Sequence, residues 1–316
     1  MSTSRTPDRE TWVSPRVDAD DAYLASVREA CEETASRLPA LCYLAYLRNG
    51  VPLVRLGRGE AGDVSGGTGM ASAFTVLARQ MAYHVRTLDE DLQKARTGRL
   101  IRTVLHTDAH ALFYDMVRPG EEFLGVVEQP DAVRAGDEAV AELAGAFRAR
   151  ARLTSANYGS FACPHPGPPP EVPADGTVQD RLRAVVRPDG LHFASYWVNG
   201  RREEIEHCFS HPGLTAPVVV DADAEISPRQ RLDFHLAFAR RLKSLATDLK
   251  LTSGGALKGR LNRIVLDVEA GAVFYARLPA QRYLTAVTLD QSMVSLADDI
   301  VVRLAQTLWE PNGDNG

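Results

Sequence analysis

Two pairs of cysteine and histidine residues have the spacing at which side chains can share a metal ion. The first pair is Cys163 and His165, and the second is Cys208 and His211. Thiolate and imidazole together form a typical zinc-binding set, so the four side chains predict a zinc site if their loops converge. The spacing differs from that of a zinc finger, and loop positions with one buried cysteine explain the same residues. Both interpretations stay open, and zinc is the one cofactor that the sequence suggests.

A second group of polar residues, His106, Asp108 and His110, alternates around a predicted turn. A catalytic triad would require a serine or cysteine nucleophile matched to these residues, and none is visible. The corresponding positions later in the chain do not repeat the chemistry, because they hold Asp267, Glu269 and Gly271. We interpret the group as a solvated turn and predict no catalytic residue.

Two loops have compositions that sometimes mark binding sites. Residues 57–69, GRGEAGDVSGGTG, precede a predicted helix, where backbone N–H groups can bind an anion. They lack the spacing of a phosphate-binding loop, so we predict a surface loop. Residues 156–176 are dense in Pro and Gly and include a P-x-x-P pattern that an aromatic groove can bind. A spacer between two halves explains the same composition.

The strongest pattern in the chain is an internal duplication. Residues 99–114, RLIRTVLHTDAHALFY, return as residues 260–275, RLNRIVLDVEAGAVFY, at a constant offset of 161 with nine of sixteen positions identical. The same offset aligns residues 71–88 with 232–249, and residues 139–147 with 300–308. A repeat of this length predicts two structurally equivalent halves.

Hydrophobic periodicity and turn residues predict the elements of each half. The first half contains a helix near 21–38, strands 41–47 and 51–57 around an Asn-Gly turn, a helix at 71–88, three strands within 99–128 and a helix ending near 148. The second half repeats this order, although its opening segment at 179–190 fits a helix or a strand. These elements predict an antiparallel sheet with helices packed on it. The predicted parts are poorly ordered tails at 1–17 and 311–316, domains at 18–150 and 179–310, and a Pro/Gly-rich linker at 151–178.

Composition excludes several classes of protein. The chain has 316 residues and a net charge of −5, which is unlike the basic surface of a nucleic-acid-binding protein. No apolar run reaches the roughly 20 residues of a membrane helix, and the N-terminus lacks the apolar segment of a signal peptide. Four cysteines are too few for a disulfide scaffold. We therefore expect a cytoplasmic protein that neither binds nucleic acid nor inserts into a membrane.

On this layout, each half resembles the Roadblock/LC7 domain family. The similarity lies in Leu38-Pro39 followed by an apolar strand and Asn49-Gly50-Val51-Pro52-Leu53, and in the turn-separated strands at 99–128 and 260–289. The resemblance implies an α/β (α+β) fold with two Roadblock-like (profilin-like) domains. Each domain would be a five-stranded antiparallel sheet packed with helices, and the two would form an intramolecular pseudo-dimer.

The resemblance also implies a function without an active site of its own. Roadblock domains pair through the long second helix and the following edge strand. Such pairs are platforms that bind small Ras-like GTPases, and the nearest they come to catalysis is to activate the GTPase. A regulator or scaffold is therefore the leading hypothesis, and further homo-oligomerisation stays open. The expected interface residues are Leu77, Arg79, Met81, Arg99, Arg102, Phe238, Arg240, Leu242, Arg260 and Arg263.

Two other interpretations remain. The repeated positions can record core packing alone, and the repeated arginines can cap a helix or solvate a face instead of anchoring a partner. The alternative function is a ligand- or zinc-binding sensor module of profilin- or GAF-like fold. A hydrolase built on the histidines and cysteines has little support.

Overall fold

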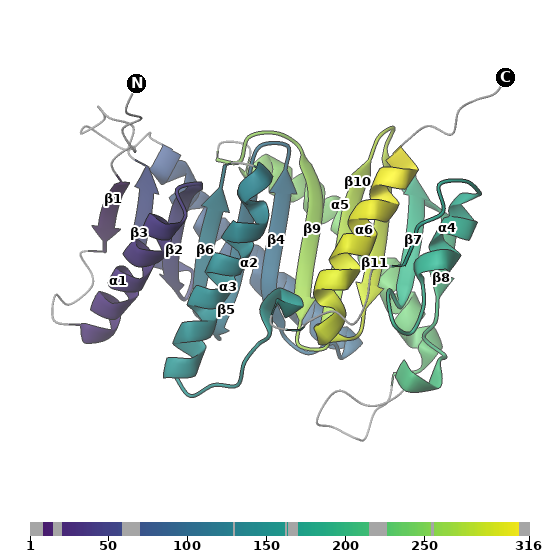
Figure 1. Cartoon of the computed structure of the whole chain (residues 1–316), viewed down its shortest axis with the longest axis horizontal. Coiled ribbons are helices and arrows are strands. Elements are labelled where there is room, and N and C mark those ends of the chain that lie inside the picture. Colours follow the sequence, from purple (N-terminus) through teal and green to yellow (C-terminus); the bar gives the residue numbers. More distant parts are fainter. Residues whose placement is uncertain are drawn as a thin grey trace. The chain divides into compact units, whose positions relative to one another are not determined.

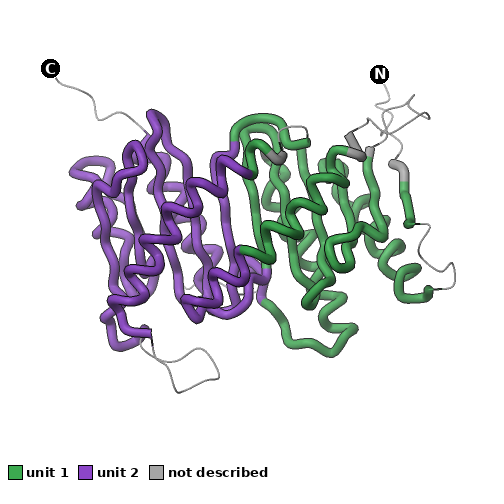
Figure 2. Tube along the Cα trace, turned by 180° about the vertical axis from the view of Figure 1, so that it is seen from behind, with its two compact units in different colours: residues 1–87, 102–156, 249–260 green, residues 88–101, 157–248, 261–316 purple. Residues whose placement is uncertain are grey.

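The computed structural model describes residues 9–14, 21–58, 70–128, 130–161, 163, 170–214, 226–253 and 256–309. The chain divides into two compact units (Figure 2). Unit 1 comprises residues 1–87, 102–156 and 249–260, and unit 2 comprises residues 88–101, 157–248 and 261–316. Each unit therefore contains most of one repeat and a short segment of the other.

Unit 1 is built on an antiparallel sheet with strand order β1-β3-β2-β6-β5-β4 (Figure 1). Its strands are β1 (Arg9–Val13), β2 (Leu41–Arg48), β3 (Val51–Arg58), β4 (Leu100–Thr107), β5 (Ala111–Arg118) and β6 (Glu121–Val127). The first two residues of β4 cluster with unit 2. The helices are α1 (Ala22–Arg37), α2 (Met70–Leu92), whose residues from 88 onward belong to unit 2, and α3 (Val133–Arg150).

Alternation along β2 assigns the helices of unit 1 to two faces of the sheet. The ring of Tyr43 packs against Phe74 of α2, with 5.2 Å between ring centroids. Tyr46 is three residues further along β2 and points to the other face, where Tyr23 of α1 lies 6.2 Å away. Phe147 of α3 joins the same face through Tyr23, at 5.8 Å. Because successive strand side chains point to opposite faces, α1 and α3 cover one face and α2 the other.

Unit 2 repeats this architecture with strand order β9-β10-β11-β7-β8. Its elements are α4 (Val178–Val185), β7 (Phe193–Val198), β8 (Arg201–His207), α5 (Pro228–Ser253), β9 (Leu261–Val268), β10 (Gly271–Leu278), β11 (Arg282–Thr288) and α6 (Val294–Trp309). Single 3-10 turns lie at Gln93–Ala95, Pro130–Ala132, Tyr158–Ser160, Pro212–Leu214 and Gln291–Met293. In α5, residues from 249 onward belong to unit 1.

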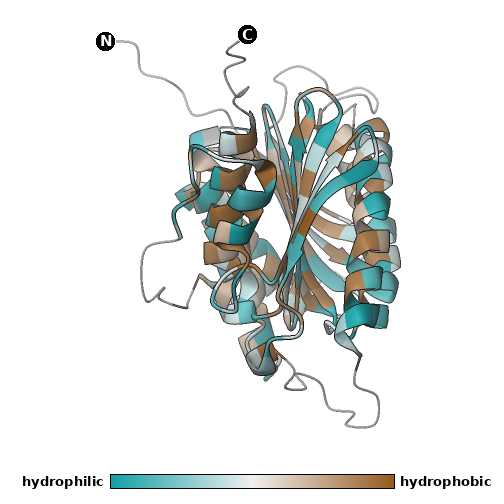
Figure 3. Ribbon diagram, turned by 90° about the vertical axis from the view of Figure 1, so that its right-hand side faces the viewer, coloured by the Kyte–Doolittle hydropathy of each residue, from teal (hydrophilic) through white to brown (hydrophobic). Residues whose placement is uncertain are grey.

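Each unit buries its core between the sheet and the helices. Helix α6 packs on β10 and β11, and α4 packs on β7 and β8. On the other face, the rings of Trp197 and Tyr283 are stacked at 5.5 Å. Figure 3 shows hydrophobic residues on the sheet and on the sides of the helices that face it. This is the amphipathic pattern from which the helices were predicted.

Three local expectations differ from the structure. Residues 9–13 lie in the predicted tail but form β1, so the sheet of unit 1 has a sixth strand. Residues 158–160, in the predicted linker, form a 3-10 turn with Tyr158 buried in unit 2. The undecided segment 179–190 begins as helix α4, which starts with a capping box between Thr177 and Asp180. Most of the glycine-rich loop, 59–69, and the tail 310–316 lie outside the described residues.

None of the helices in the described ranges combines the length and hydropathy that crossing a bilayer requires.

Candidate interaction site

In unit 1, a segment from the end of the second repeat's long helix binds the β4–β5 turn of the first repeat. Asp108 donates its backbone N–H to the carbonyl oxygen of Arg260 at 3.2 Å. The Asp108 carboxylate accepts the backbone N–H of Arg260 at 3.1 Å and its Nε at 3.3 Å. Thr107 donates to the carbonyl of Lys258 at 2.7 Å, and Lys258 donates its N–H to Nδ1 of His110 at 3.1 Å. This network fixes residues 258–260 to the turn.

In unit 2, the corresponding contact has the roles of the repeats exchanged. Glu269, in the β9–β10 turn, donates its backbone N–H to the carbonyl of Arg99 at 3.0 Å. Its carboxylate accepts the backbone N–H of Arg99 at 2.9 Å. Ala270 donates to the carbonyl of Thr97 at 3.0 Å. The end of α2 is held in the same unit by Asp91, which pairs with Arg241 of α5.

These two contacts are equivalent at the repeat offset of 161. Asp108 corresponds to Glu269, and Arg99 corresponds to Arg260. In each contact, a carboxylate at a hairpin turn accepts a hydrogen bond from the backbone of an arginine that follows a left-handed glycine, Gly98 or Gly259. We call these segments, 88–101 and 249–260, the exchanged segments. Each repeat therefore contributes a piece to the unit built on the other repeat.

The repeated pair Arg102 and Arg263 joins a strand to the closing helix inside each unit. Arg102 is 4% exposed and pairs with Asp137 of α3, while its Nε lies 3.7 Å from Asp115. Arg263 Nη1 lies 3.0 Å from Asp298 of α6. Asp137 and Asp298 are themselves separated by 161 residues. These two arginines therefore have carboxylate partners within their own units.

The remaining expected interface residues lie on α2 and α5. The four apolar residues among them are buried, namely Leu77, Met81, Phe238 and Leu242. Arg79 and Arg240 are exposed, and the Arg240 guanidinium lies over the ring of Trp197 at 5.7 Å. The structure thus places the apolar members in the core and leaves these two arginines at the surface.

The exposed faces of α2 and α5 differ in character. On α2, Val76 is 53% and Tyr83 is 68% exposed, and both lie with Arg79 and Arg86 on one side of the helix. The corresponding exposed residues of α5 are smaller apart from the arginine, being Ala237, Arg240, Ser244 and Thr247. Tyrosine and arginine are enriched among residues that dominate binding energy. The face of α2 is therefore the better candidate for contact with another protein.

The four predicted zinc ligands have different partners where they are described. Cys163 accepts a hydrogen bond from Asn157 at 3.3 Å, and Cys208 donates to the carbonyl of His192 at 3.7 Å. His211 accepts the N–H of Gly213 at 3.2 Å. His165 lies outside the described residues, and among the residues that are described no three His, Cys, Asp or Glu side chains form a group able to hold a metal ion. The four-ligand site stays a prediction.

Protonation also works against metal binding at one of these cysteines. Burial raises the pKa of the Cys208 thiol to about 11. A thiol ligates zinc as the thiolate, so binding would have to overcome this preference for the neutral form.

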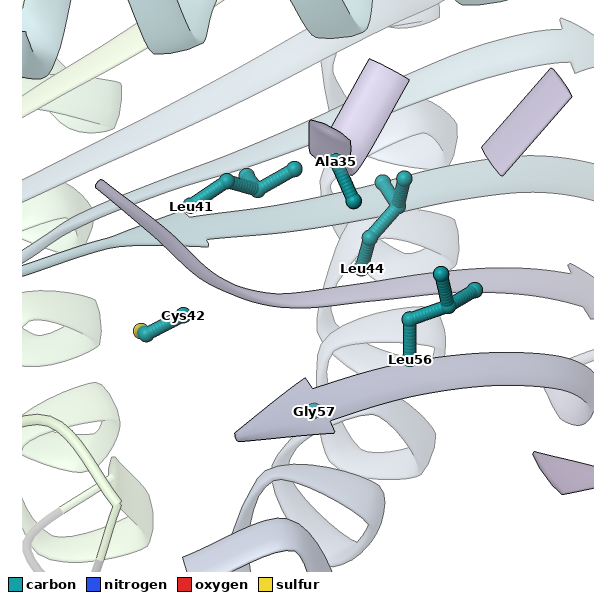
Figure 4. A pocket seen from close by; sticks show the side chains of 6 residues that line it. All are labelled: Ala35, Leu41, Cys42, Leu44, Leu56 and Gly57. Atoms are coloured by element: carbon teal, nitrogen blue, oxygen red, sulfur yellow. The ribbon is translucent and has the colours of Figure 1, made fainter. Parts of the chain in front are cut away.

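One small pocket lies in unit 1, between α1 and the β2–β3 hairpin (Figure 4). Its lining is Ala35, Leu41, Cys42, Leu44, Leu56 and Gly57. The hollow has no room for even a water molecule, so it is far below the usual size of a ligand pocket. The Cys42 thiol donates to the carbonyl of Val126 at 3.3 Å, so it is already engaged. The pocket offers no reactive group.

Solved structures similar to this chain include MglB proteins and a Roadblock/LC7 domain. An MglB with a tetrameric arrangement shares 15% identity, covering 44% of this chain and 98% of its own, with a TM-score of 0.33. The gliding protein MglB from Thermus thermophilus shares 15% identity, covering 44% and 99%, with a TM-score of 0.31. The Roadblock/LC7 domain from Streptomyces avermitilis shares 16% identity, covering 40% and 98%, with a TM-score of 0.27.

Roadblock structures are thus among the similar ones, as the resemblance in sequence led us to expect. At these identities and TM-scores, the similarity concerns the fold alone and identifies no partner. No protein-family model and no curated protein matches the sequence.

Sequence reasoning missed several residues that distinguish the two repeats. Tyr83, Glu122 and His235 were not singled out, because each has an ordinary identity for its helix or strand. The offset of 161 was the available signal, since it pairs them with Ser244, Tyr283 and Phe74. The same offset would have paired Asp137 with Asp298 as partners of the repeated arginines.

Proposed function

We propose that this chain is a non-enzymatic regulator or scaffold that binds a small Ras-like GTPase. In this proposal the two repeats act as the two members of a Roadblock pair within one molecule. The class of partner comes from the resemblance of each half to the Roadblock/LC7 family. The reciprocal contribution of segments 88–101 and 249–260 supports pairing within the chain, because each repeat helps to complete the other's unit. A covalent link between them also gives each repeat a high effective concentration of its partner.

The observation that carries the proposal is the exposed face of α2. Tyr83 and Val76 expose more than half of their surface there, beside Arg79 and Arg86. An amphipathic ring flanked by two cations suits a protein surface with an apolar centre and acidic neighbours. The GTPase therefore binds mainly to the exposed face of α2, and the equivalent face of α5 contributes less to its binding.

Binding to α2 is tested with the full chain and a Ras-like GTPase encoded beside its gene, loaded with GDP or with a non-hydrolysable GTP analogue. Isothermal titration calorimetry should detect a complex at micromolar concentrations. The Tyr83→Ala variant should bind at least about tenfold more weakly, as expected for loss of a central aromatic contact. The matched Ser244→Ala variant on α5 should bind like the unaltered protein. If neither nucleotide state forms a complex, the proposal fails.

A hydrolysis assay separates regulation from scaffolding. If the chain activates the GTPase through an arginine, Arg79→Ala or Arg240→Ala should abolish the stimulation of GTP hydrolysis while the complex still forms. A complex with no stimulation by the unaltered chain would indicate a scaffold.

A further inference from the structure

Helix α5 carries a histidine where the equivalent helix of the first repeat carries a phenylalanine. His235 and Phe74 are separated by the repeat offset, and they are 2% and 1% exposed. Phe74 packs on Tyr43 and contributes no polar atom to its core. His235 occupies the same kind of position with two polar nitrogen atoms. The second repeat therefore has a titratable group in a place that the first repeat fills with hydrocarbon.

The surroundings of His235 are aromatic. Its ring lies 5.5 Å from Phe209, 5.8 Å from Phe193 and 5.2 Å from Phe234, measured between ring centroids. Neither Nδ1 nor Nε2 has a hydrogen-bond partner in the part of the chain that the structure describes. A buried polar group without a partner destabilises the folded state, and a charged one does so far more strongly.

Among the described residues, the charged group that acts on His235 is a cation. Arg231, one turn earlier on α5, is a cation whose guanidinium lies 5.9 Å from the Phe209 ring. His207 of β8 stacks on Phe209 at 5.5 Å. At the start of β7, His192 accepts the N–H of Leu289 and its other nitrogen contacts the carbonyl of Pro188. The Cys208 thiol points at the His192 carbonyl. A proton on His235 would therefore add positive charge beside Arg231 in an apolar site.

We propose that His235 makes α5 an acid-sensitive element, whose packing against Phe193 and Phe209 opens when the imidazole takes up a proton. Burial, and then the charge of Arg231, lower the pKa of His235 to about 3, in agreement with this geometry. An exposed imidazole has a pKa of about 6.5, so opening is coupled to protonation below that pH. Unit 2 thus contains a response to acid that unit 1 lacks at the same position. This inference does not depend on GTPase binding.

The expected size of the effect follows from these two pKa values. Between pH 7.5 and pH 5.0, the open form gains a proton on His235 while the closed form stays neutral. The equilibrium constant for opening should rise about 30-fold over this interval. Above pH 7.5 no further change is expected from His235, because both forms are neutral there.

Hydrogen exchange of the full chain tests the proposal. Exchange is followed by mass spectrometry at pH 7.5 and pH 5.0, with correction for the intrinsic rate at each pH. Peptides within 231–246 should lose protection at pH 5.0 by about 30-fold, and His235→Phe, which installs the residue of the first repeat, should remove most of this loss. The reciprocal variant Phe74→His should create a new acid-dependent loss of protection in residues 73–87.

A second measurement uses the unaltered protein and so does not depend on a variant that folds. Two-dimensional NMR of the histidine side chains should show that one imidazole, assigned to His235 by its absence in His235→Phe, stays neutral in the folded protein down to pH 5. An imidazole that titrates near pH 6.5 without loss of protection would overturn the proposal. So would an unchanged acid response in a folded His235→Phe variant.

Discussion

The two repeats of this chain share the contacts that assemble the units and differ in what they present to solvent and to protons. Both repeats have the arginine–aspartate pairs at Arg102 and Arg263, and both have the hydrogen bonds from an arginine of an exchanged segment to a turn carboxylate. Tyr83 is replaced by Ser244 on the exposed helix face, and Phe74 by His235 in the core. The two repeats thus share the contacts that hold each unit together, and they differ on the exposed helix face and at one position of the core.

The sheet edges show the same contrast. In unit 1, the outer edge of β3 is covered by β1, which pairs with it from Arg9 to Val13. In unit 2, the equivalent strand β8 instead has three exposed charged residues, Arg201, Arg202 and Glu203. Gln179 of α4 also donates to the carbonyl of Ile205 on this strand at 3.3 Å. Charges and side-chain hydrogen bonds are an alternative means of preventing unwanted strand pairing.

The largest expected difference between the repeats is at their shared arginine. Arg102→Met would remove the guanidinium that lies beside Asp115 and Asp137, whose side chains are 0% and 15% exposed. We expect the free energy of unfolding to fall by about 3–5 kcal/mol. Arg263→Met removes a pair that is 18% and 30% exposed, and should cost about 1 kcal/mol. Urea unfolding at pH 7 measures both variants, and equal losses would contradict the contrast.

The exchanged segments should be nearly as sensitive. A Cβ on Gly98 would lie 2.6 Å from the Cβ of Glu269, at a backbone φ of +79°. Gly98→Ala should therefore destabilise the protein by about 2–3 kcal/mol. Gly259→Ala, at φ +89° and 3.0 Å from the Cβ of Asp108, should cost about 1–2 kcal/mol.

The matched control for both glycines is Gly145 of α3, where an added Cβ meets nothing within 4 Å. Gly145→Ala should stabilise the protein by about 0.5–1 kcal/mol. Thermal unfolding ranks the three variants. A Gly98→Ala protein as stable as the unaltered one would show that the exchanged segment does not hold unit 2 together.

The third contrast is a partly buried carboxyl group, Glu122, in the first repeat, for which the second repeat has no equivalent. Burial raises the pKa of Glu122 to about 7, and the equivalent position is Tyr283. The folded state favours the protonated form of Glu122. The contribution of this carboxyl group to the free energy of unfolding is therefore complete below about pH 4.5 and is lost as the pH rises towards 7. Glu122→Gln should therefore be more stable than the unaltered protein at pH 8, by about 1–2 kcal/mol after allowance for partial exposure.

Urea unfolding at pH 5 and pH 8 tests the Glu122 prediction. Tyr283→Phe serves as the control and should show the pH dependence of the unaltered chain in this range, since burial raises the pKa of Tyr283 to about 12. An advantage of Glu122→Gln that is the same at both pH values would point to packing rather than ionisation.

The smallest effect is expected at the sheet edge. The Arg55 guanidinium lies 4.0 Å from the centroid of the Trp12 ring, which fastens β1 to β3. Trp12→Ala should cost about 0.5–1 kcal/mol and raise hydrogen exchange in β1 and β3 only. Arg202→Ala on the exposed edge β8 should change stability by less than about 0.5 kcal/mol. A larger loss of stability in Arg202→Ala than in Trp12→Ala would contradict the expected difference between the two sheet edges.

Elements with local signals were predictable from the sequence. The Asn49-Gly50 turn is an example, because both residues have a positive φ, of 52° and 73°, as the tight turn of a hairpin requires. The capping box at Thr177 and Asp180 was equally local, but the eight-residue helix that follows it was too short to show a period. Strand β1 pairs with β3, whose residues are more than 40 positions away, and the composition of β1 does not predict this pairing.

The candidate site was harder to foresee for the same reason. The contacts of Asp108 with Arg260 and of His110 with Lys258 join residues about 150 positions apart. The duplication singled out Arg99 and Arg260, but it did not indicate that the turn carboxylates Glu269 and Asp108 accept hydrogen bonds from their backbone N–H groups. Asp108 was interpreted only as part of a solvated turn, and Glu269 only as its counterpart in the second repeat.

The placement of residues 249–260 in unit 1 has a consequence for how the protein is made. As the chain leaves the ribosome, the first repeat emerges long before the piece that completes its unit, and it must wait for residue 260. Contacts between residues so far apart in the sequence form late and slowly. We therefore expect chaperones to bind this protein while its first repeat has been synthesised and residues 249–260 have not.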